Sequence, residues 1–254
     1  MHLNENVIRW TLGLCLNLLL AFVLFRNRVY RRLPVFGVYL LVVIVCDFLS
    51  SGMRLLFPVR SAAIFYEFWT GQAVMIGARA AAVGEVCFQI LSPYRGIWKL
   101  CRMFLAAVAL VLLGCAAYSA AGQPHLMTPF IMVLQRGLEL AIVGTLAFAL
   151  VFAMYYELKI PRFLMLITGG LLFYSAIQIA NSQFMSTLRG PYHEAYAALS
   201  LFSFNIASLI WVVALWKPLP AMESAQAPSE LGVSAPEVHA RLRELNARLS
   251  EILR

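Results

Sequence analysis

Long apolar runs separated by short polar or proline-containing joints dominate the pattern of this chain. A helix that crosses a bilayer needs about 20 mostly apolar residues, and seven runs fit that requirement. The runs cover 7–25, 33–53, 61–91, 103–121, 129–155, 162–184 and 195–216. The joints are too short to hold inserted domains, so consecutive helices should be antiparallel neighbours. The pattern predicts an all-α membrane protein, a compact bundle of seven transmembrane helices.

Composition supports a membrane location. Hydrophobic residues make up 62% of the 254-residue chain and charged residues only 13%, whereas a soluble domain is roughly half apolar and a quarter charged. The apolar excess cannot be hidden in one water-soluble core, so we expect the lipid bilayer to be the main partner.

The distribution of Lys and Arg predicts the orientation of the bundle. Ten basic residues fall in the first, third and fifth joints and directly after the last run, and four fall on the opposite side. Loops rich in Lys and Arg stay in the cytoplasm, so the N-terminus is predicted outside and the C-terminus inside. Because the basic residues form short clusters between apolar runs rather than a stripe, the net charge of +8 predicts no nucleic-acid partner.

A change of composition divides the chain into three segments. The transmembrane domain covers 1–218, and a flexible linker rich in Pro, Ala and Ser covers 219–235. Apolar residues then recur at alternating spacings of four and three, which is typical of a short cytoplasmic coiled-coil helix over 236–254. These residues are Val238, Leu242, Leu245, Leu249 and Ile252. Such a short helix is marginal alone, so it predicts contact with a second copy, a cytoplasmic protein or the membrane surface; an inert amphipathic tail is the alternative.

A weak internal repeat appears when the chain is offset by 127 residues. The offset aligns Arg9 with Arg136 and Glu67 with Glu194. Helices 1–3 would then correspond to helices 5–7, as in small transporters built from three-helix repeats. The other explanation of the matches is that polar and proline residues recur at helix ends in any bundle of this kind.

Charged residues fall inside predicted spans, among them Asp47, Arg79, Glu85, Arg136 and Glu139. A charge at mid-bilayer costs about 3 kcal/mol on insertion scales, so these side chains should face the bundle interior or one another. Their depths along antiparallel helices predict two pairings. Arg136 should pair with Asp47 or Glu67, and Arg79 with Glu139 or Glu85.

Amides at helical spacing extend this set, and together the residues predict a polar cavity between helices 3 and 5. The predicted lining is Asp47, Gln72, Arg79, Glu85, Gln135, Arg136, Glu139 and Asn205. One interpretation is a site for a solute, proton or ligand. The other is interhelical bonding that only fixes packing.

Other chemistries lack the residues they need. A retinal protein requires a mid-membrane lysine, but Lys99, Lys159 and Lys217 all lie at predicted interfaces. The five cysteines are scattered singly and the four histidines are spread out, so we predict no metal site, no cofactor and no disulfide framework. Motifs of hydrolases, phosphate loops and dinucleotide-binding domains are absent, so we expect no enzyme.

Several local patterns, in this order and spacing, resemble a group of uncharacterised seven-helix bacterial membrane proteins common in acidobacteria. They are Arg-Leu-Pro-Val-Phe-Gly-Val-Tyr-Leu at 32–40, Phe-Tyr-Glu-Phe-Trp at 65–69, Glu85 with Ser-Pro-Tyr at 92–94, Gln-Arg at 135–136, and 205–218. The resemblance covers 1–220 and implies the seven-helix topology and the bacterial inner membrane, without an activity. Where the group commonly has Tyr-Glu, this chain has Gly84-Glu85, and where the group has Glu-Arg, it has Gln135-Arg136.

Two functional hypotheses follow. In the first, the chain is a sensory or scaffolding component whose tail helix engages a partner or a second copy. In the second, it is a small-solute or proton transporter or channel that uses the buried Arg and Glu residues of helices 3 and 5.

Overall fold

The computed structural model describes residues 2–58, 61–92, 95–121, 127–155, 158, 160–187, 192–217 and 244. Within these ranges the chain forms seven α-helices, one 3₁₀ turn and no strand. The helices are α1 (His2–Arg26), α2 (Pro34–Leu56), α3 (Ala62–Leu91), α4 (Arg95–Ala120), α5 (Met127–Tyr155), α6 (Arg162–Thr187) and α7 (Tyr192–Leu215), and the turn η1 is Val29–Arg31.

Six of the helices, α2 to α7, are long and apolar enough to cross a membrane. The apolar stretch of α1, Gly13–Arg26, is shorter. The chain is therefore a helical, multi-pass membrane protein, as the hydrophobic pattern predicted. The predicted linker and tail helix lie outside the described residues, apart from Glu244.

Helix α4 begins at Arg95, eight residues before the predicted start of the fourth apolar run at 103. Hydropathy marks where the apolar core of a span lies, whereas the hydrogen-bonded helix continues through basic residues at the interface. The first turns of α4 therefore contain Lys99 and Arg102, which the sequence pattern assigned to the joint or to its edge.

Six helices form a closed ring through their contacts. Helix α1 packs on α2 and α7, α2 on α3, α3 on α5, α5 on α6, and α6 on α7. Contacts between α3 and α6 cross the interior. Each half of the ring thus contributes three helices, one half before α4 and one after it; the internal repeat stays a prediction.

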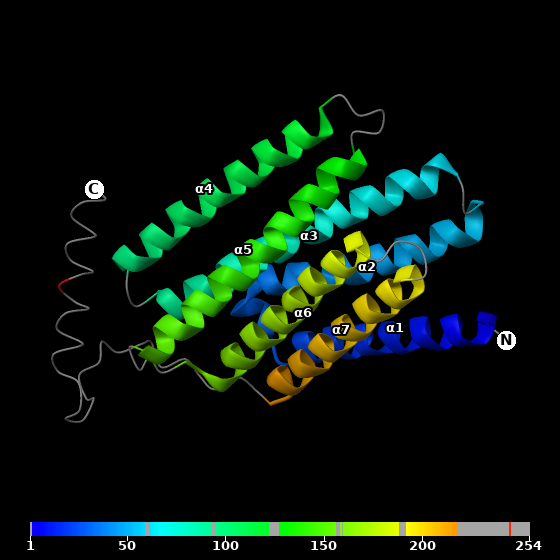
Figure 1. Cartoon of the computed structure of the whole chain (residues 1–254). Coiled ribbons are helices and arrows are strands. Elements are labelled where there is room, and N and C mark those ends of the chain that lie inside the picture. The colour runs from blue at the N-terminus through cyan, green and yellow to red at the C-terminus, as the bar shows by residue number, and fades with distance from the viewer. Residues whose placement is uncertain are drawn as a thin grey trace.

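Helix α4 lies outside this ring and packs mainly on α5 (Figure 1). Only 6% of its apolar stretch is buried, against 28–44% in the other five candidate spans. Gly137 of α5 makes the contact close, because the side chain of Leu112 from α4 occupies the space that a β-carbon at Gly137 would need.

An aromatic cluster fills the ring at the end where α7 finishes. Trp211 is fully buried, and its indole N–H donates to the carbonyl of Ile167 on α6 at 3.2 Å. The Trp211 ring lies edge-on to Phe36 of α2, with centroids 5.5 Å apart, and 6.1 Å from the ring of Phe204. Gly170 leaves room for the indole, since a β-carbon there would overlap the indole nitrogen.

This packing predicts that Gly170→Ala destabilises the bundle by about 1–3 kcal/mol, because the added methyl group displaces Trp211. Gly169→Ala is the matched control. A β-carbon at Gly169 meets nothing within 4 Å, so alanine there should change stability by less than about 1 kcal/mol. The free energy of unfolding in detergent micelles measures both, and equal effects would contradict this account of the indole packing.

Candidate functional site: a buried polar centre inside the ring

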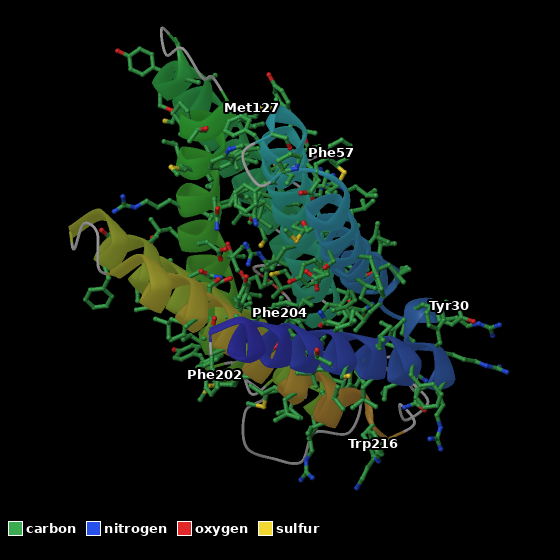
Figure 2. The ribbon with its side chains drawn as sticks, turned by 90° about the vertical axis from the view of Figure 1, so that its right-hand side faces the viewer. Tyr30, Phe57, Met127, Phe202, Phe204 and Trp216 are labelled. Carbon is green, nitrogen blue, oxygen red and sulfur yellow. The ribbon has the colours of Figure 1, made fainter. Side chains whose placement is uncertain are left out.

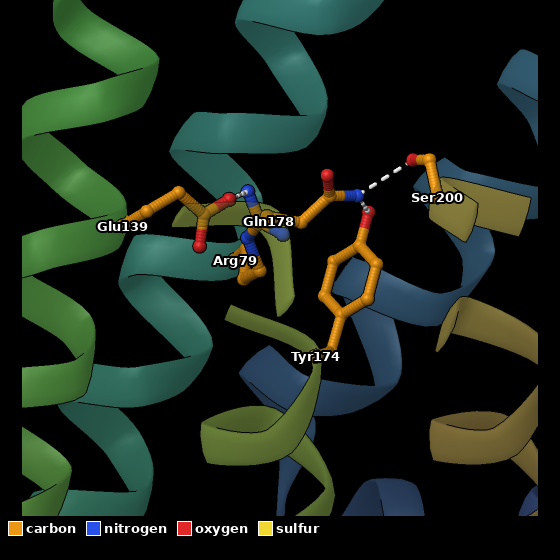
Figure 3. Close-up of polar contacts among 5 residues, drawn as sticks. All are labelled: Arg79, Glu139, Tyr174, Gln178 and Ser200. Atoms are coloured by element: carbon orange, nitrogen blue, oxygen red, sulfur yellow. Dashed lines mark hydrogen bonds and ion pairs between the residues drawn. The ribbon is translucent and has the colours of Figure 1, made fainter. Parts of the chain in front are cut away.

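An ion pair between α3 and α5 lies in the interior of the ring. Arg79 and Glu139 are 5% and 2% exposed, and the Arg79 guanidinium donates to the Glu139 carboxylate (Figure 3). One of the two alternatives that the sequence predicted for Arg79 is thereby confirmed. A lone charge at this depth would be strongly destabilising, and the opposite charge offsets that cost.

The pair extends to α6 and α7 through polar contacts. The guanidinium carbon of Arg79 lies 5.0 Å from the ring centroid of Tyr174, a cation–π distance. The Gln178 amide donates to the Tyr174 hydroxyl at 2.9 Å and to the Ser200 hydroxyl at 2.7 Å (Figure 3). We call Arg79, Glu139, Tyr174, Gln178 and Ser200 the polar centre.

Two atoms of the ion pair lack a hydrogen-bond partner. These are Nε of Arg79 and Oε2 of Glu139, both buried. The pair is thus joined at one point rather than in the two-point fork that arginine and a carboxylate commonly form. Buried polar atoms are nearly always satisfied by protein or by ordered water. The centre therefore has one donor and one acceptor available to a small polar partner such as water.

Glu85 has a different role from the one predicted, because it caps a helix instead of lining the polar centre. Its carboxylate accepts from the backbone N–H groups of Val35 at 3.1 Å and Phe36 at 2.8 Å. Helix α2 begins with Leu33 as its N-cap residue, which supplies no side-chain acceptor, and with Pro34 in the first turn. A carboxylate from α3 satisfies the exposed N–H groups and complements the positive end of the helix dipole.

The predicted pairing of Arg136 is wrong. Asp47 accepts instead from the amide of Asn17 on α1 at 3.0 Å, and Glu67 accepts from the hydroxyl of Ser50 at 2.6 Å. Arg136 is exposed, and among the described residues it forms no ion pair with either carboxylate. Short polar side chains on neighbouring helices satisfy the two acids, while a long arginine side chain can extend along the outer surface toward water.

No described hydrogen bond joins the remaining predicted residues to the ion pair. Gln72 and Gln135 are partly buried. Asn205 faces α1, where its side-chain oxygen is buried without a hydrogen-bond partner beside Gly13. Of the eight predicted residues, only Arg79 and Glu139 are bonded to each other, while Glu85 caps α2 and Asp47 contacts Asn17. A single cavity lined by all eight stays a prediction.

Sequence inspection missed Tyr174 and Ser200. Tyr174 precedes Gln178 by four residues on α6, and that spacing places the two on one helix face, so the signal for Tyr174 was present. Ser200 carried no signal, since serine is ordinary in membrane helices. In the part of the chain that the structure describes, no three His, Cys, Asp or Glu residues lie close enough to hold a metal ion.

Comparison of the chain with protein-family models, curated proteins and solved structures gives no match. The resemblance to seven-helix acidobacterial membrane proteins therefore stays a prediction.

The geometry predicts strong energetic coupling between Arg79 and Glu139. Arg79→Ala and Glu139→Ala should each destabilise the bundle by about 3 kcal/mol, because each leaves the partner charge buried alone. The double variant should cost less than the sum, by about 1–3 kcal/mol. Arg136→Ala, which removes an exposed arginine, is the control and should have little effect. Additive costs in a detergent unfolding titration would refute the pairing.

Proposed function

We propose that this chain is a sensory membrane component in which the polar centre is the input and α7 with its cytoplasmic tail is the output. The observation that carries the proposal is a continuous set of contacts from the buried ion pair to α7. Tyr174 lies under Arg79, and Gln178 on the same face of α6 bonds to Ser200 of α7. A change in the charge or occupancy of the pair would therefore act directly on the helix that leads into the tail.

Aromatic packing continues this set of contacts along α7. The Tyr174 and Phe204 ring centroids are 5.5 Å apart, and Phe204 in turn packs on Trp211 and through it on Phe36. We call Tyr174, Phe204, Trp211 and Phe36 the aromatic ladder. Close-packed elements of this kind favour discrete arrangements over gradual deformation, which suits a sensor with two states.

The features of the polar centre support an input role. Both charges are buried where charge is costly, and both retain an unpaired polar atom. Ionisable residues placed so deep in a membrane protein mark binding or proton-transfer sites more often than residues at its surface do. A polar ligand or a proton that engages Glu139 would compete with Arg79 for the carboxylate.

The proposed output requires the topology predicted from the sequence. In that topology α1 is a seventh span, the N-terminus lies outside, and 219–254 lies in the cytoplasm of a bacterial cell. The excess of Lys and Arg in the first, third and fifth joints supports this orientation. The proposed tail helix, with its apolar seam from Val238 to Ile252, would then engage a cytoplasmic protein or a second copy.

Crosslinked pull-down from native membranes tests the proposal, with full-length chain, a chain truncated after Pro220, and full-length Glu139→Gln. We expect a partner or second copy to be crosslinked by the full-length chain alone. Its yield should change about fivefold or more in Glu139→Gln, the usual size of allosteric coupling. Glu67→Gln, a carboxylate outside the centre, is the matched control and should behave as wild type.

If the full-length and truncated chains capture the same proteins, the tail is not the output. If the yield of crosslinked partner is unchanged in Glu139→Gln, the polar centre is not the input. These two failures are distinguishable, because the first variant alters only the tail and the second only the centre.

A small-solute or proton transporter is the second candidate, and the unpaired Arg79 Nε and Glu139 Oε2 favour it, because a permeant ion or water needs such partners inside a bundle. Proteoliposomes loaded with a pH-sensitive dye should then show proton flux that Glu139→Gln abolishes and Glu67→Gln leaves intact. Flux that is absent from the wild type, or unaffected by Glu139→Gln, would exclude a proton pathway through the centre.

A further inference from the structure

Four exposed basic residues gather where α1, η1 and α7 meet. Arg26 ends α1, Arg28 is the N-cap residue of η1, Arg31 ends η1, and Lys217 lies just beyond α7. We call these four residues the basic collar. They come from the end of α1, the residues that follow it and the end of α7, which the structure brings together.

The backbone that carries the collar is held firmly. The side-chain amide of Asn27 donates to the carbonyl oxygens of Leu215 and Trp216 at the end of α7. Val29 and Leu33, on either side of Arg31, are 0% and 1% exposed and belong to the hydrophobic core. The collar side chains therefore start from fixed positions, which lowers the entropy lost when they bind a ligand.

Arg28 adopts a left-handed backbone conformation, with φ of 51°. A residue with a β-carbon is uncommon in this region. The conformation turns the chain sharply after Asn27, so that Val29 enters the core while Arg28 and Arg31 both remain exposed. Gln89 of α3 donates to the carbonyl of Arg32 at 3.2 Å and supports the turn from the other side.

Exposed aromatic side chains border the collar. Phe22 and Phe25 lie on the outer face of α1, Tyr30 is within η1, and Trp216 precedes Lys217. Figure 2 shows Tyr30 and Trp216 toward the same end of the bundle, with nitrogen-tipped side chains around them. Phenylalanine on a membrane-facing helix contacts acyl chains, and Tyr and Trp favour the headgroup level. The collar thus lies beside an apolar surface that is suited to contact with lipid.

The charges of the collar arginines are open to an external anion. Among the described residues, Arg26, Arg28 and Arg31 form no ion pair. Glu85 of α3 accepts from two backbone N–H groups of α2 and pairs with none of these arginines.

We propose that the basic collar binds the headgroup of an anionic phospholipid, with the phosphate against the arginines and the acyl chains along Phe22 and Phe25. Guanidinium groups bind phosphate oxygens in a planar, two-point geometry. The adjoining apolar surface selects a lipid over a free anion, because a soluble phosphate would leave that surface without a partner. Lipid bound here would bridge the first turn and the end of α7, the helix that leads into the tail.

Native mass spectrometry of the full-length protein in detergent tests the proposal, with phosphatidylglycerol and phosphatidylcholine of equal chain length as probes. Wild type should retain phosphatidylglycerol preferentially. Each collar charge removed should weaken that preference about fivefold, so Arg26→Gln/Arg28→Gln/Arg31→Gln should abolish it. Lys217→Gln, which alters no described structural contact, should lower it about fivefold by itself.

The matched control is Arg102→Gln/Arg136→Gln/Arg162→Gln, which removes three exposed arginines elsewhere on the bundle and should keep the preference. An equal loss in this control would show a response to net charge alone and overturn the proposal. A preference that survives the collar variants would also overturn it. If millimolar inorganic phosphate displaces phosphatidylglycerol from the wild type, the basic collar binds free anions and is not a lipid site.

Discussion

The rest of the structure depends on the ion pair between Arg79 and Glu139. A bilayer offers no water to a charge in its interior, so each of these side chains needs the other. Their helices, α3 and α5, are not consecutive in the chain, and the pair joins the two halves of the ring across the gap left by α4. The arrangement also explains why α4 can lie outside, since the ring closes without it.

The ion pair also positions the features that connect the middle of the membrane to one end. Tyr174 packs under the arginine, and the aromatic ladder continues to Phe36 at the start of α2, where Glu85 caps the helix. The basic collar lies beyond, joined to α7 by Asn27. The proposed input, the proposed output helix and the proposed lipid site thus share α7, which suits a sensor that responds to both a ligand and its bilayer.

The helices could be predicted from the sequence because hydropathy and the required length of a span leave few alternatives. Depth along the helices narrowed the partner of Arg79 to Glu139 or Glu85, and the structure shows Glu139. It failed for Arg136, because depth does not say on which side of a helix a side chain leaves the bundle. It failed for Glu85 because this residue of α3 caps α2. Such a contact depends on how the two helices pack, which no local sequence pattern encodes. The start of α4 was missed because basic residues lower hydropathy without ending a helix.

We propose that the charge state of the polar centre controls α7. The most direct test is the distance between spin labels on Val74 of α3 and Val213 of α7, both exposed positions, measured by pulsed electron resonance in lipid nanodiscs. If the charge state of the polar centre controls α7, Glu139→Gln shifts or broadens the distance distribution, while Glu67→Gln reproduces the wild-type distribution. The same distribution in wild type and Glu139→Gln would show that the ion pair does not control α7 and has a purely structural role.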